Sequence, residues 1–124
     1  MIFIIGGAYQ GKLTYAKERF GFDETQICDC AEETPDFSKP CIRHTEEYVY
    51  RCIQENGDPM AFFRENKEKW ADSVLIMRDI FCGVVPMGAD MRAWREASGR
   101  LAMYLSGEAE EVYRLFCGLE QKIK

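Results

Sequence analysis

The sequence predicts one α/β domain over residues 1–124 with a mostly parallel sheet, and three observations carry this prediction. A chain of 124 residues fits a single hydrophobic core. Continuously apolar runs, which are typical of strands buried on both faces, open the chain at 1–5 and recur at 73–77. Stretches with helical periodicity separate the expected strands, and this alternation favours parallel strands with helices on both faces of the sheet.

The N-terminal elements follow from one apolar run and several glycines. Met1–Ile5 is expected to form the first strand because it is continuously apolar and rich in β-branched residues. The segment Gly6–Gly11 is expected to form a glycine-rich turn, and Lys12–Phe20 a helix that ends at Gly21. Thr25–Cys30 is the second expected strand.

The middle of the chain is predicted to be helical from Cys41 onwards. The apolar stripe of this helix is formed by Ile42, Thr45, Val49, Cys52 and Ile53. Its charged residues are expected off the stripe: Arg43, Glu46, Glu47 and Arg51. Asp58 is expected to cap a second helix, with Pro59 at its first helical position. That helix is expected to pack through Met60, Phe62, Phe63 and Trp70.

The C-terminal part continues the alternation of strand and helix. Ser73–Met77 is expected to be a buried strand, followed by a loop over Arg78–Gly88. Asp90–Leu105 is the longest amphipathic segment, and Ser106-Gly107 is expected to end this helix. Val112–Cys117 is the last expected strand.

Charge and cysteine usage exclude several classes of function. The net charge is −5 and the pI is near 5.0, so the chain lacks the basic field that attracts nucleic acid. The apolar start is too short for a signal peptide or a membrane span, so we expect a cytoplasmic protein without a membrane partner. In a reducing cytoplasm the six cysteines are expected to be free thiols, most of them buried. A zinc site is not expected, because the chain has no CxxC pair and a single histidine.

A phosphate-binding motif directly follows the first expected strand. The motif reads Gly6, Gly7, Ala8, Tyr9, Gln10, Gly11, Lys12, and it matches GxxxxGK. Glycines let successive backbone N–H groups point at one phosphate, the following helix adds its positive end, and Lys12 reaches the outer phosphates. Tyr9 and Gln10 form the tip of the loop, where either side chain can reach a ligand. An ordinary glycine-rich turn is the alternative, but the position after an N-terminal apolar strand favours a P-loop NTPase-like three-layer domain.

The sequence contains only some of the residues that bind Mg²⁺ in proteins with this motif. The pattern normally continues with Ser or Thr, whose hydroxyl binds Mg²⁺, but Leu13 stands at this position. Thr14 follows, rotated by about 100° around the helix, so its hydroxyl is not expected to substitute. Asp79, just beyond the strand at 73–77, is the expected acid that organises Mg²⁺, and Asp29 is the other candidate. The sequence therefore predicts binding of GTP or ATP with Mg²⁺, and contains no base-reading motif that would choose between the two nucleotides.

Two parts of the chain resemble the adenosylcobinamide kinase/adenosylcobinamide-phosphate guanylyltransferase family. One is the N-terminal stretch through Lys12, and the other is the C-terminal third. The C-terminal features, in their order and spacing, are Gly83-Val84-Val85-Pro86, Arg92, Arg95, Gly99-Arg100, Ala109-Glu110-Glu111-Val112-Tyr113, Cys117-Gly118 and Lys122-Ile123-Lys124. The part between them is poorly matched.

The resemblance implies an activity and partners. In this family a nucleoside triphosphate phosphorylates the aminopropanol hydroxyl of adenosylcobinamide, and a histidine then accepts GMP from GTP and passes it to that phosphate. The resemblance thus implies a kinase of cobalamin biosynthesis that forms homo-oligomers, with Lys12 and Asp79 in the catalytic site. Arg92, Arg95 and Arg100 share one face of the C-terminal helix. They are either a cationic patch for nucleotide or corrinoid phosphate or for a neighbouring subunit, or the solvated face of an ordinary helix.

The chain departs from the family pattern at three places. Leu13 replaces the hydroxyl residue, Asp79 and Phe81 stand where the family has Glu and Gly, and the segment of the guanylylated histidine is shortened. His44 lies in the corresponding region without an evident partner to orient it, so a solvated surface position is the main expectation and a nucleophile the second. Phosphoryl transfer is therefore the clearer expectation, and guanylyl transfer is doubtful. The alternative function is a non-catalytic relative that acts as a binding or regulatory module.

Overall fold

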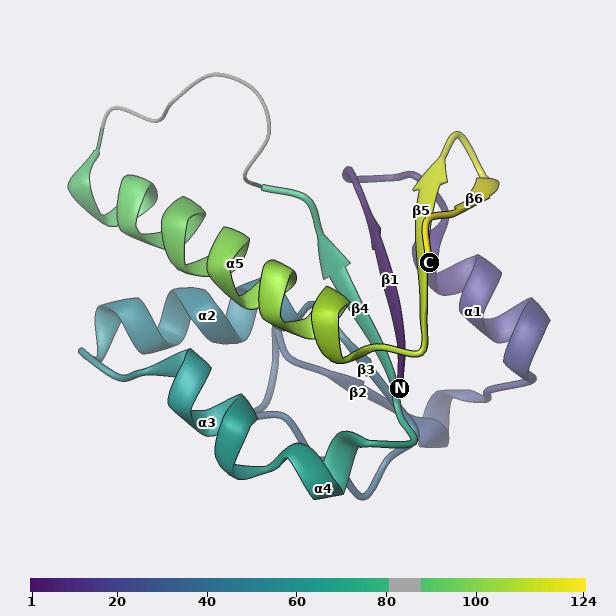
Figure 1. The fold of residues 1–124 in the computed structure, drawn as a ribbon, viewed down its shortest axis with the longest axis horizontal. Helices are drawn as coiled ribbons and strands as arrows, with labels where there is room; N and C mark the ends of the chain where they lie inside the picture. Colours follow the sequence, from purple (N-terminus) through teal and green to yellow (C-terminus); the bar gives the residue numbers. More distant parts are fainter. Residues whose placement is uncertain (81–87) are drawn as a thin grey trace.

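The computed structural model describes residues 1–80 and 88–124, and within them the chain forms one six-stranded sheet (Figure 1). The strands are β1 (Ile2–Gly6), β2 (Ile27–Asp29), β3 (Cys41–Arg43), β4 (Val74–Arg78), β5 (Glu111–Phe116) and β6 (Leu119–Lys122). Their order is β2-β3-β4-β1-β5-β6, and each neighbouring pair is parallel except β5 and β6. The expected α/β class with a mostly parallel sheet is confirmed.

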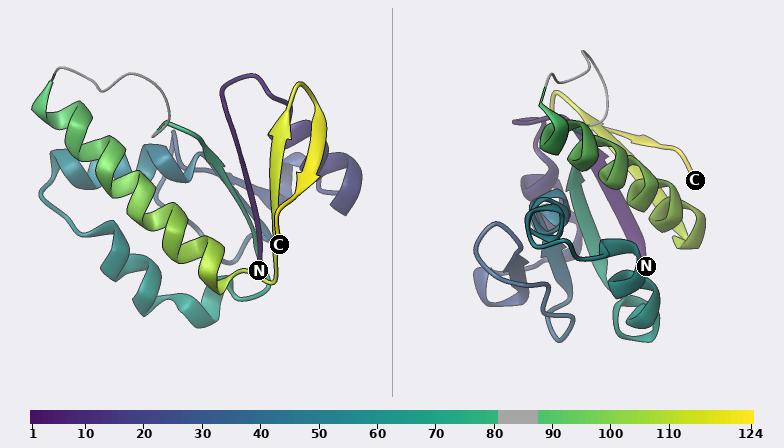
Figure 2. Two further views of the ribbon diagram at one scale, coloured as in Figure 1. Left: turned by 45° about the horizontal axis from the view of Figure 1, so that its top comes forward. Right: turned by 90° about the vertical axis from the view of Figure 1, so that its left-hand side faces the viewer.

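The helices cover both faces of the sheet. They are α1 (Lys12–Phe20), α2 (Thr45–Gln54), α3 (Pro59–Glu65), α4 (Lys67–Trp70) and α5 (Ala89–Glu108). The chain leaves β1 through α1 in one direction along the sheet and returns through α2 to α5 in the other. Because crossovers between parallel strands are right-handed, opposite directions place the helices on opposite faces. Accordingly α1 lies on one side, and α2, α3 and α5 lie on the other (Figures 1 and 2).

Each face of the sheet has its own hydrophobic core. Phe3 and Ile4 are neighbours on β1 and both are fully buried, because alternate side chains of a strand point to opposite faces. Phe3 belongs to the larger core beneath α2, α3 and α5, which also contains Trp70 and Leu101. Ile4 belongs to the smaller core beneath α1, which contains Ala16. Both cores meet at β1, so this strand is the centre of the fold.

The prediction of a helix from Cys41 is wrong at its start. Cys41–Arg43 forms β3, paired in parallel with both β2 and β4, and α2 begins only at Thr45. His44 separates the two elements by adopting a left-handed backbone conformation, with φ of 57°. A strand this short carries no clear period-2 pattern, so pairing with its neighbours rather than propensity decides its structure. The charged Glu46 is also on the buried face of α2, contrary to expectation.

Other boundaries agree with the sequence only in part. The strand expected over Thr25–Cys30 is shorter, because Glu24–Gln26 forms a 3-10 helix capped by Asp23 and β2 begins at Ile27. Helix α1 has the expected limits, and Gly21 ends it in the left-handed region at φ 72°. Asp58 caps α3 by accepting a hydrogen bond from the Ala61 N–H, and Pro59 is its first residue, as expected. Helix α5 continues through Ser106-Gly107 to Glu108, so the prediction that it ends there is wrong.

The sequence did not predict β6, whose residues are all exposed. This strand forms because Cys117 and Gly118 both have positive φ, 51° and 77°, which gives the tight turn that matches hairpin twist. Among the described cysteines, Cys28, Cys30, Cys41 and Cys52 are buried free thiols as expected, while Cys117 is exposed. None of the described helices combines the length and apolar character needed to cross a membrane.

Gly6 occupies a position that no larger residue fits. A Cβ built on Gly6 would lie 2.6 Å from the carbonyl oxygen of Leu115 on β5. We therefore expect Gly6→Ala to lower the free energy of unfolding by about 1–3 kcal/mol, because the backbone of β1 or β5 must shift. Urea denaturation followed by circular dichroism measures this change.

Gly107→Ala is the matched control for that substitution. Gly107 lies within α5, and nothing is found within 4 Å of a Cβ built there. Alanine is expected to raise the free energy of unfolding by about 0.5–1 kcal/mol at this helical site. Equal effects of the two substitutions would contradict the close packing of β1 against β5.

Candidate functional site

The glycine loop, residues Gly7–Gly11, leaves the sheet at the point where its strand order reverses. Strand β1 pairs with β4 on one side and with β5 on the other. The chain goes from β1 to the strands beyond β4 first, and reaches β5 only later. In open α/β sheets ligands bind outside the carboxyl ends of the strands at such a switch point. The loop therefore lies where the topology favours a binding site.

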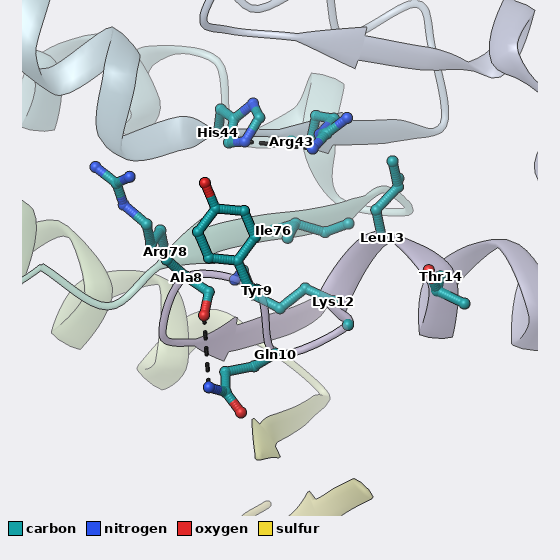
Figure 3. A pocket seen from close by; sticks show the side chains of 11 residues that line it. Ala8, Tyr9, Gln10, Lys12, Leu13, Thr14, Arg43, His44, Ile76 and Arg78 are labelled. Carbon is teal, nitrogen blue, oxygen red and sulfur yellow. Dashed lines mark hydrogen bonds between the residues drawn. The ribbon is translucent and has the colours of Figure 1, made fainter. Parts of the chain in front are cut away.

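A pocket of ≈ 290 Å³ opens beside the glycine loop (Figure 3). It is lined by Ala8, Tyr9, Gln10, Gly11, Lys12, Leu13, Thr14, Arg43, His44, Ile76 and Arg78. The loop and the first turn of α1 form one wall, and the ends of β3 and β4 form the other. Figure 3 shows Arg43 and His44 across the pocket from the loop, with the ring of Tyr9 extending towards them. The structure thus brings His44 to the predicted loop residues, whereas Arg92 and Arg95 on α5 do not line this pocket.

The backbone of the glycine loop is arranged with its amides available. Within the described part of the chain, the N–H groups of Ala8 to Gly11 donate no hydrogen bond. Tyr9 and Gly11 have positive φ, 59° and 87°, and alternation of left- and right-handed residues is the geometry that points successive N–H groups into one concavity. The amides of the first turn of α1 add further donors, because a helix leaves its first N–H groups without internal partners.

Lys12 lies under this loop. Its Nζ donates a hydrogen bond to the carbonyl oxygen of Gly7 at 2.6 Å, so the ammonium is folded back into the loop. Burial lowers the pKa of Lys12 below its ordinary value, and Glu46 opposes that shift. The positive charges of Arg78 and Arg43 also lower the pKa of Lys12. A group of cations therefore surrounds one pocket in a protein that is acidic overall.

Gln10 ties the loop to the C-terminal hairpin. Its backbone carbonyl accepts a hydrogen bond from Gly118 N–H at 3.0 Å, and its side-chain Oε1 accepts one from Cys117 N–H. Its Nε2 donates to the carbonyl of Ala8 at 3.4 Å (Figure 3). The turn between β5 and β6 thus supports the loop from outside the pocket. The predicted contact of Gln10 with a ligand remains a prediction.

His44 has two polar partners beside the pocket. Its Nδ1 is 2.7 Å from Oδ1 of Asp29, and its Nε2 is 3.3 Å from a guanidinium nitrogen of Arg43. Because arginine only donates, Nε2 is the acceptor in this arrangement and Nδ1 carries the proton donated to Asp29. Burial alone raises the pKa of Asp29, but the hydrogen bonds from His44 and from the Ala31 N–H hold it below the usual range.

The expectation that His44 lacks an orienting partner is therefore wrong. Asp29 and Arg43 are paired residues at the carboxyl ends of the parallel strands β2 and β3. That register brings the residue after Arg43 next to the Asp29 carboxylate. Recognising Cys41–Arg43 as a strand would have revealed the pair from the sequence.

Asp79 is where the sequence places it, at the carboxyl end of the strand beside β1. Its backbone N–H donates to the carbonyl oxygen of Gly6 at 2.8 Å, which joins the loop after β4 to the end of β1. Its negative charge also acts to raise the pKa of Lys12. The role of Asp79 towards Mg²⁺ remains a prediction. Phe81 and the segment 83–86 lie outside the described residues.

Glu46 is a residue of the site that sequence reasoning missed. It is fully buried, and its Oε1 accepts a hydrogen bond from the Arg78 N–H at 2.6 Å, while its Oε2 accepts one from the Glu47 N–H at 3.1 Å. Burial raises the pKa of this carboxyl. The carboxyl group thus joins the start of α2 to the end of β4. Its charge suggested a solvent-facing position, and only the tertiary contact with β4 shows otherwise.

The side chains present fit Mg²⁺ poorly. Leu13, at the hydroxyl position, packs into the core beneath α1, and Thr14 is exposed. No group of three or more His, Cys, Asp or Glu among residues 1–80 and 88–124 is placed to hold a metal ion. Asp29 accepts a hydrogen bond from His44, and both carboxylate oxygens of Glu46 accept hydrogen bonds from backbone N–H groups. Asp79 remains the predicted metal ligand, and a single carboxylate is a poor site for Mg²⁺.

Comparison with known proteins adds no assignment. No protein-family model matches the chain, and no curated protein sequence is significantly similar to it. The resemblance to the cobinamide kinase family therefore remains a prediction that rests on the motifs described above.

Removing the Glu46 carboxyl is expected to destabilise the fold strongly. Glu46→Ala leaves the Arg78 N–H without its acceptor and opens a cavity, which we expect to lower the free energy of unfolding by about 2–4 kcal/mol. Chemical denaturation of the variant measures the loss. Glu47→Ala is the matched control, because Glu47 is half-buried and meets Arg78 only at 3.7 Å, and it is expected to cost less than about 1 kcal/mol. A Glu46→Ala variant as stable as Glu47→Ala would show that Glu46 does not join α2 to β4.

Proposed function

We propose that this chain is a nucleotide-binding protein with a P-loop NTPase-like fold, whose glycine loop holds the phosphates of GTP or ATP. The observation that carries the proposal is the loop backbone at the carboxyl end of β1. Its amides from Ala8 to Gly11 donate no hydrogen bond within the described chain, and Lys12 lies beneath them. Donors arranged in this way at a helix N-terminus form an anion site whatever the net charge of the protein.

The charges of the pocket support an anionic ligand. Lys12, Arg43 and Arg78 all line the pocket, although the chain carries a net charge of −5. Guanidinium groups match the paired oxygens of a phosphate, and an ammonium acts as a mobile point charge. A triphosphate chain would lie along the loop with its terminal phosphate near Lys12.

The reaction that we propose is phosphoryl transfer to a hydroxyl group. The acceptor oxygen attacks the γ-phosphorus, the bond to the β–γ bridging oxygen breaks, and the nucleoside diphosphate leaves while a carboxylate takes the hydroxyl proton. Lys12 would neutralise charge that develops on the transferring group, and Asp79, whose backbone N–H bonds to Gly6 at the start of the loop, is the candidate carboxylate. The resemblance to the cobinamide kinase family suggests adenosylcobinamide as acceptor, a homo-oligomer, a cytoplasmic location and a role in cobalamin biosynthesis.

Nucleotide affinity of a Lys12→Ala variant tests the proposal. We expect calorimetry to show that Lys12→Ala weakens binding of GTP or ATP by at least about tenfold, because one charge-assisted contact to phosphate is lost. Lys17→Ala is the control: it removes an equal charge from α1, but Lys17 pairs with Glu24. Equal binding by wild type and Lys12→Ala would contradict the proposal. Binding without phosphorylation of adenosylcobinamide would favour the non-catalytic relative.

A second candidate function is guanylyl transfer, and the pair of Asp29 and His44 favours it. Asp29 fixes the tautomer of His44 so that Nε2 carries the lone pair, and His44 lines the pocket. In this structure the lone pair accepts a hydrogen bond from Arg43, a contact that Nε2 would have to leave in order to attack. In this reaction Nε2 attacks the α-phosphorus of GTP, a P–N bond forms, and pyrophosphate leaves.

Labelling with α-labelled GTP tests the second candidate. We expect an acid-labile label on the wild-type protein, none on His44→Asn, and a rate reduced by at least about tenfold in Asp29→Asn, which no longer stabilises the charged ring. Label retained by His44→Asn would contradict the assignment to His44.

A further inference from the structure

Three cations line the pocket, and Leu13 stands where a magnesium-dependent phosphate site holds a hydroxyl. We infer that Lys12, Arg43 and Arg78 neutralise the phosphate chain of the nucleotide directly, so that binding in this pocket does not require Mg²⁺. The inference rests on the proposed nucleotide binding and concerns the cofactor of that same site.

The hydroxyl that directly binds Mg²⁺ in phosphate loops is absent from this chain. Leu13 takes its place; its side chain is half-buried, packs against the core beneath α1 and also lines the pocket. Thr14, at the next position of the helix, is exposed and lines the pocket as well. The segment 81–87, which follows the end of β4, contains no Ser, Thr, Asp, Glu or His. The sequence therefore offers no hydroxyl or acid there to replace the missing ligand.

The acids close to the pocket are already used within the protein. Asp29 accepts hydrogen bonds from His44 and from the Ala31 N–H. Glu46 is buried and accepts two backbone N–H groups. Mg²⁺ requires near-octahedral oxygen ligands and gives up its waters reluctantly, so one carboxylate from Asp79 without a hydroxyl is a weak site.

The cations are fixed at the ends of two neighbouring strands. Arg43 ends β3 and contacts Nε2 of His44, and Arg78 ends β4 with its backbone N–H held by Glu46. The guanidinium carbon of Arg78 lies 5.9 Å from the centre of the Trp94 ring, which supports the side chain from behind. Both residues line the pocket: Figure 3 shows Arg43 across it from the loop and Arg78 beside Ala8, and a guanidinium nitrogen of Arg78 lies 3.7 Å from Oε1 of Glu47.

These charges act on the same point in the pocket. Burial is the main cause that lowers the pKa of Lys12, and Arg78 and Arg43 lower it further, while Glu46, whose effect exceeds that of either arginine, and Asp79 act to raise it. A triphosphate without metal carries enough negative charge to relieve this repulsion between cations. The same triphosphate with bound Mg²⁺ carries less negative charge and brings a dication close to three cations. The arrangement therefore favours the metal-free anion.

Calorimetry in two buffers tests this inference with GTP and, separately, pyrophosphate as probes. We expect wild-type affinity for GTP in EDTA to equal or exceed its affinity in MgCl₂. Arg43→Met and Arg78→Met are each expected to weaken binding in EDTA by at least about tenfold. Arg64→Met is the matched control, because Arg64 is exposed on α3, lies over the Tyr104 ring and does not line the pocket, and it is expected to change affinity less than about twofold.

A substitution at position 13 tests whether the missing hydroxyl is the reason that nucleotide binding does not require Mg²⁺. Leu13→Ser restores the missing hydroxyl, and we expect its affinity for GTP to rise in MgCl₂ relative to EDTA. Leu13→Ala removes the same apolar packing without adding a ligand, and its affinity is expected to be insensitive to Mg²⁺. Thermal unfolding of both variants establishes that they remain folded at the temperature of the titration.

The outcomes separate this inference from the proposed function. Wild-type binding that appears only in MgCl₂ contradicts the inference and leaves nucleotide binding intact. Absence of binding in both buffers contradicts the proposed function and the inference with it. Unchanged affinity in both arginine variants also overturns the inference, because the charges would then not reach the phosphates.

Discussion

The pairing of β1 with parallel strands on both sides is the constraint on which the site depends. The carbonyl oxygen of Gly6, at the end of β1, accepts a hydrogen bond from the Asp79 N–H, and Gly6 packs against the carbonyl of Leu115. The segments on both sides of β1 therefore contact the residue at which the glycine loop begins. The chain has to turn sharply there, and glycine permits the close approach. The loop amides, Lys12 and the ends of β3 and β4 then meet in one pocket because parallel strands end at the same edge.

Polar contacts from outside the pocket hold this arrangement in place. Gln10 joins the loop tip to the turn of the C-terminal hairpin, and Glu46 joins α2 to the end of β4. Asp29 orients His44 across the β2–β3 pair. Each contact links segments that are far apart in the sequence, so the pocket depends on the whole fold rather than on the loop alone. A buried acid such as Glu46 is tolerated because backbone N–H groups satisfy both of its oxygens.

Local patterns predicted the elements whose signals lie within a few residues. The apolar run at 1–5, the limits of α1 and the cap formed by Asp58 and Pro59 all follow from sequence alone. The short strand Cys41–Arg43 did not, because its structure comes from pairing with β2 and β4. The partner of His44 and the burial of Glu46 were missed for the same reason. The loop was found from the sequence because a strand, a glycine turn and a lysine are adjacent in the chain, and the position of Asp79 because it directly follows a continuously apolar strand.

The most direct measurement of the central claim is a nitrogen–proton correlation spectrum of the assigned protein during titration with GTP. We predict that the backbone amide signals of Ala8 to Thr14 shift first and furthest, because those N–H groups donate hydrogen bonds to the phosphates. Smaller shifts are expected at Arg43, His44 and Arg78 across the pocket. Shifts confined to other parts of the sheet, or no shifts at saturating nucleotide, would contradict the assignment of the glycine loop as the phosphate site.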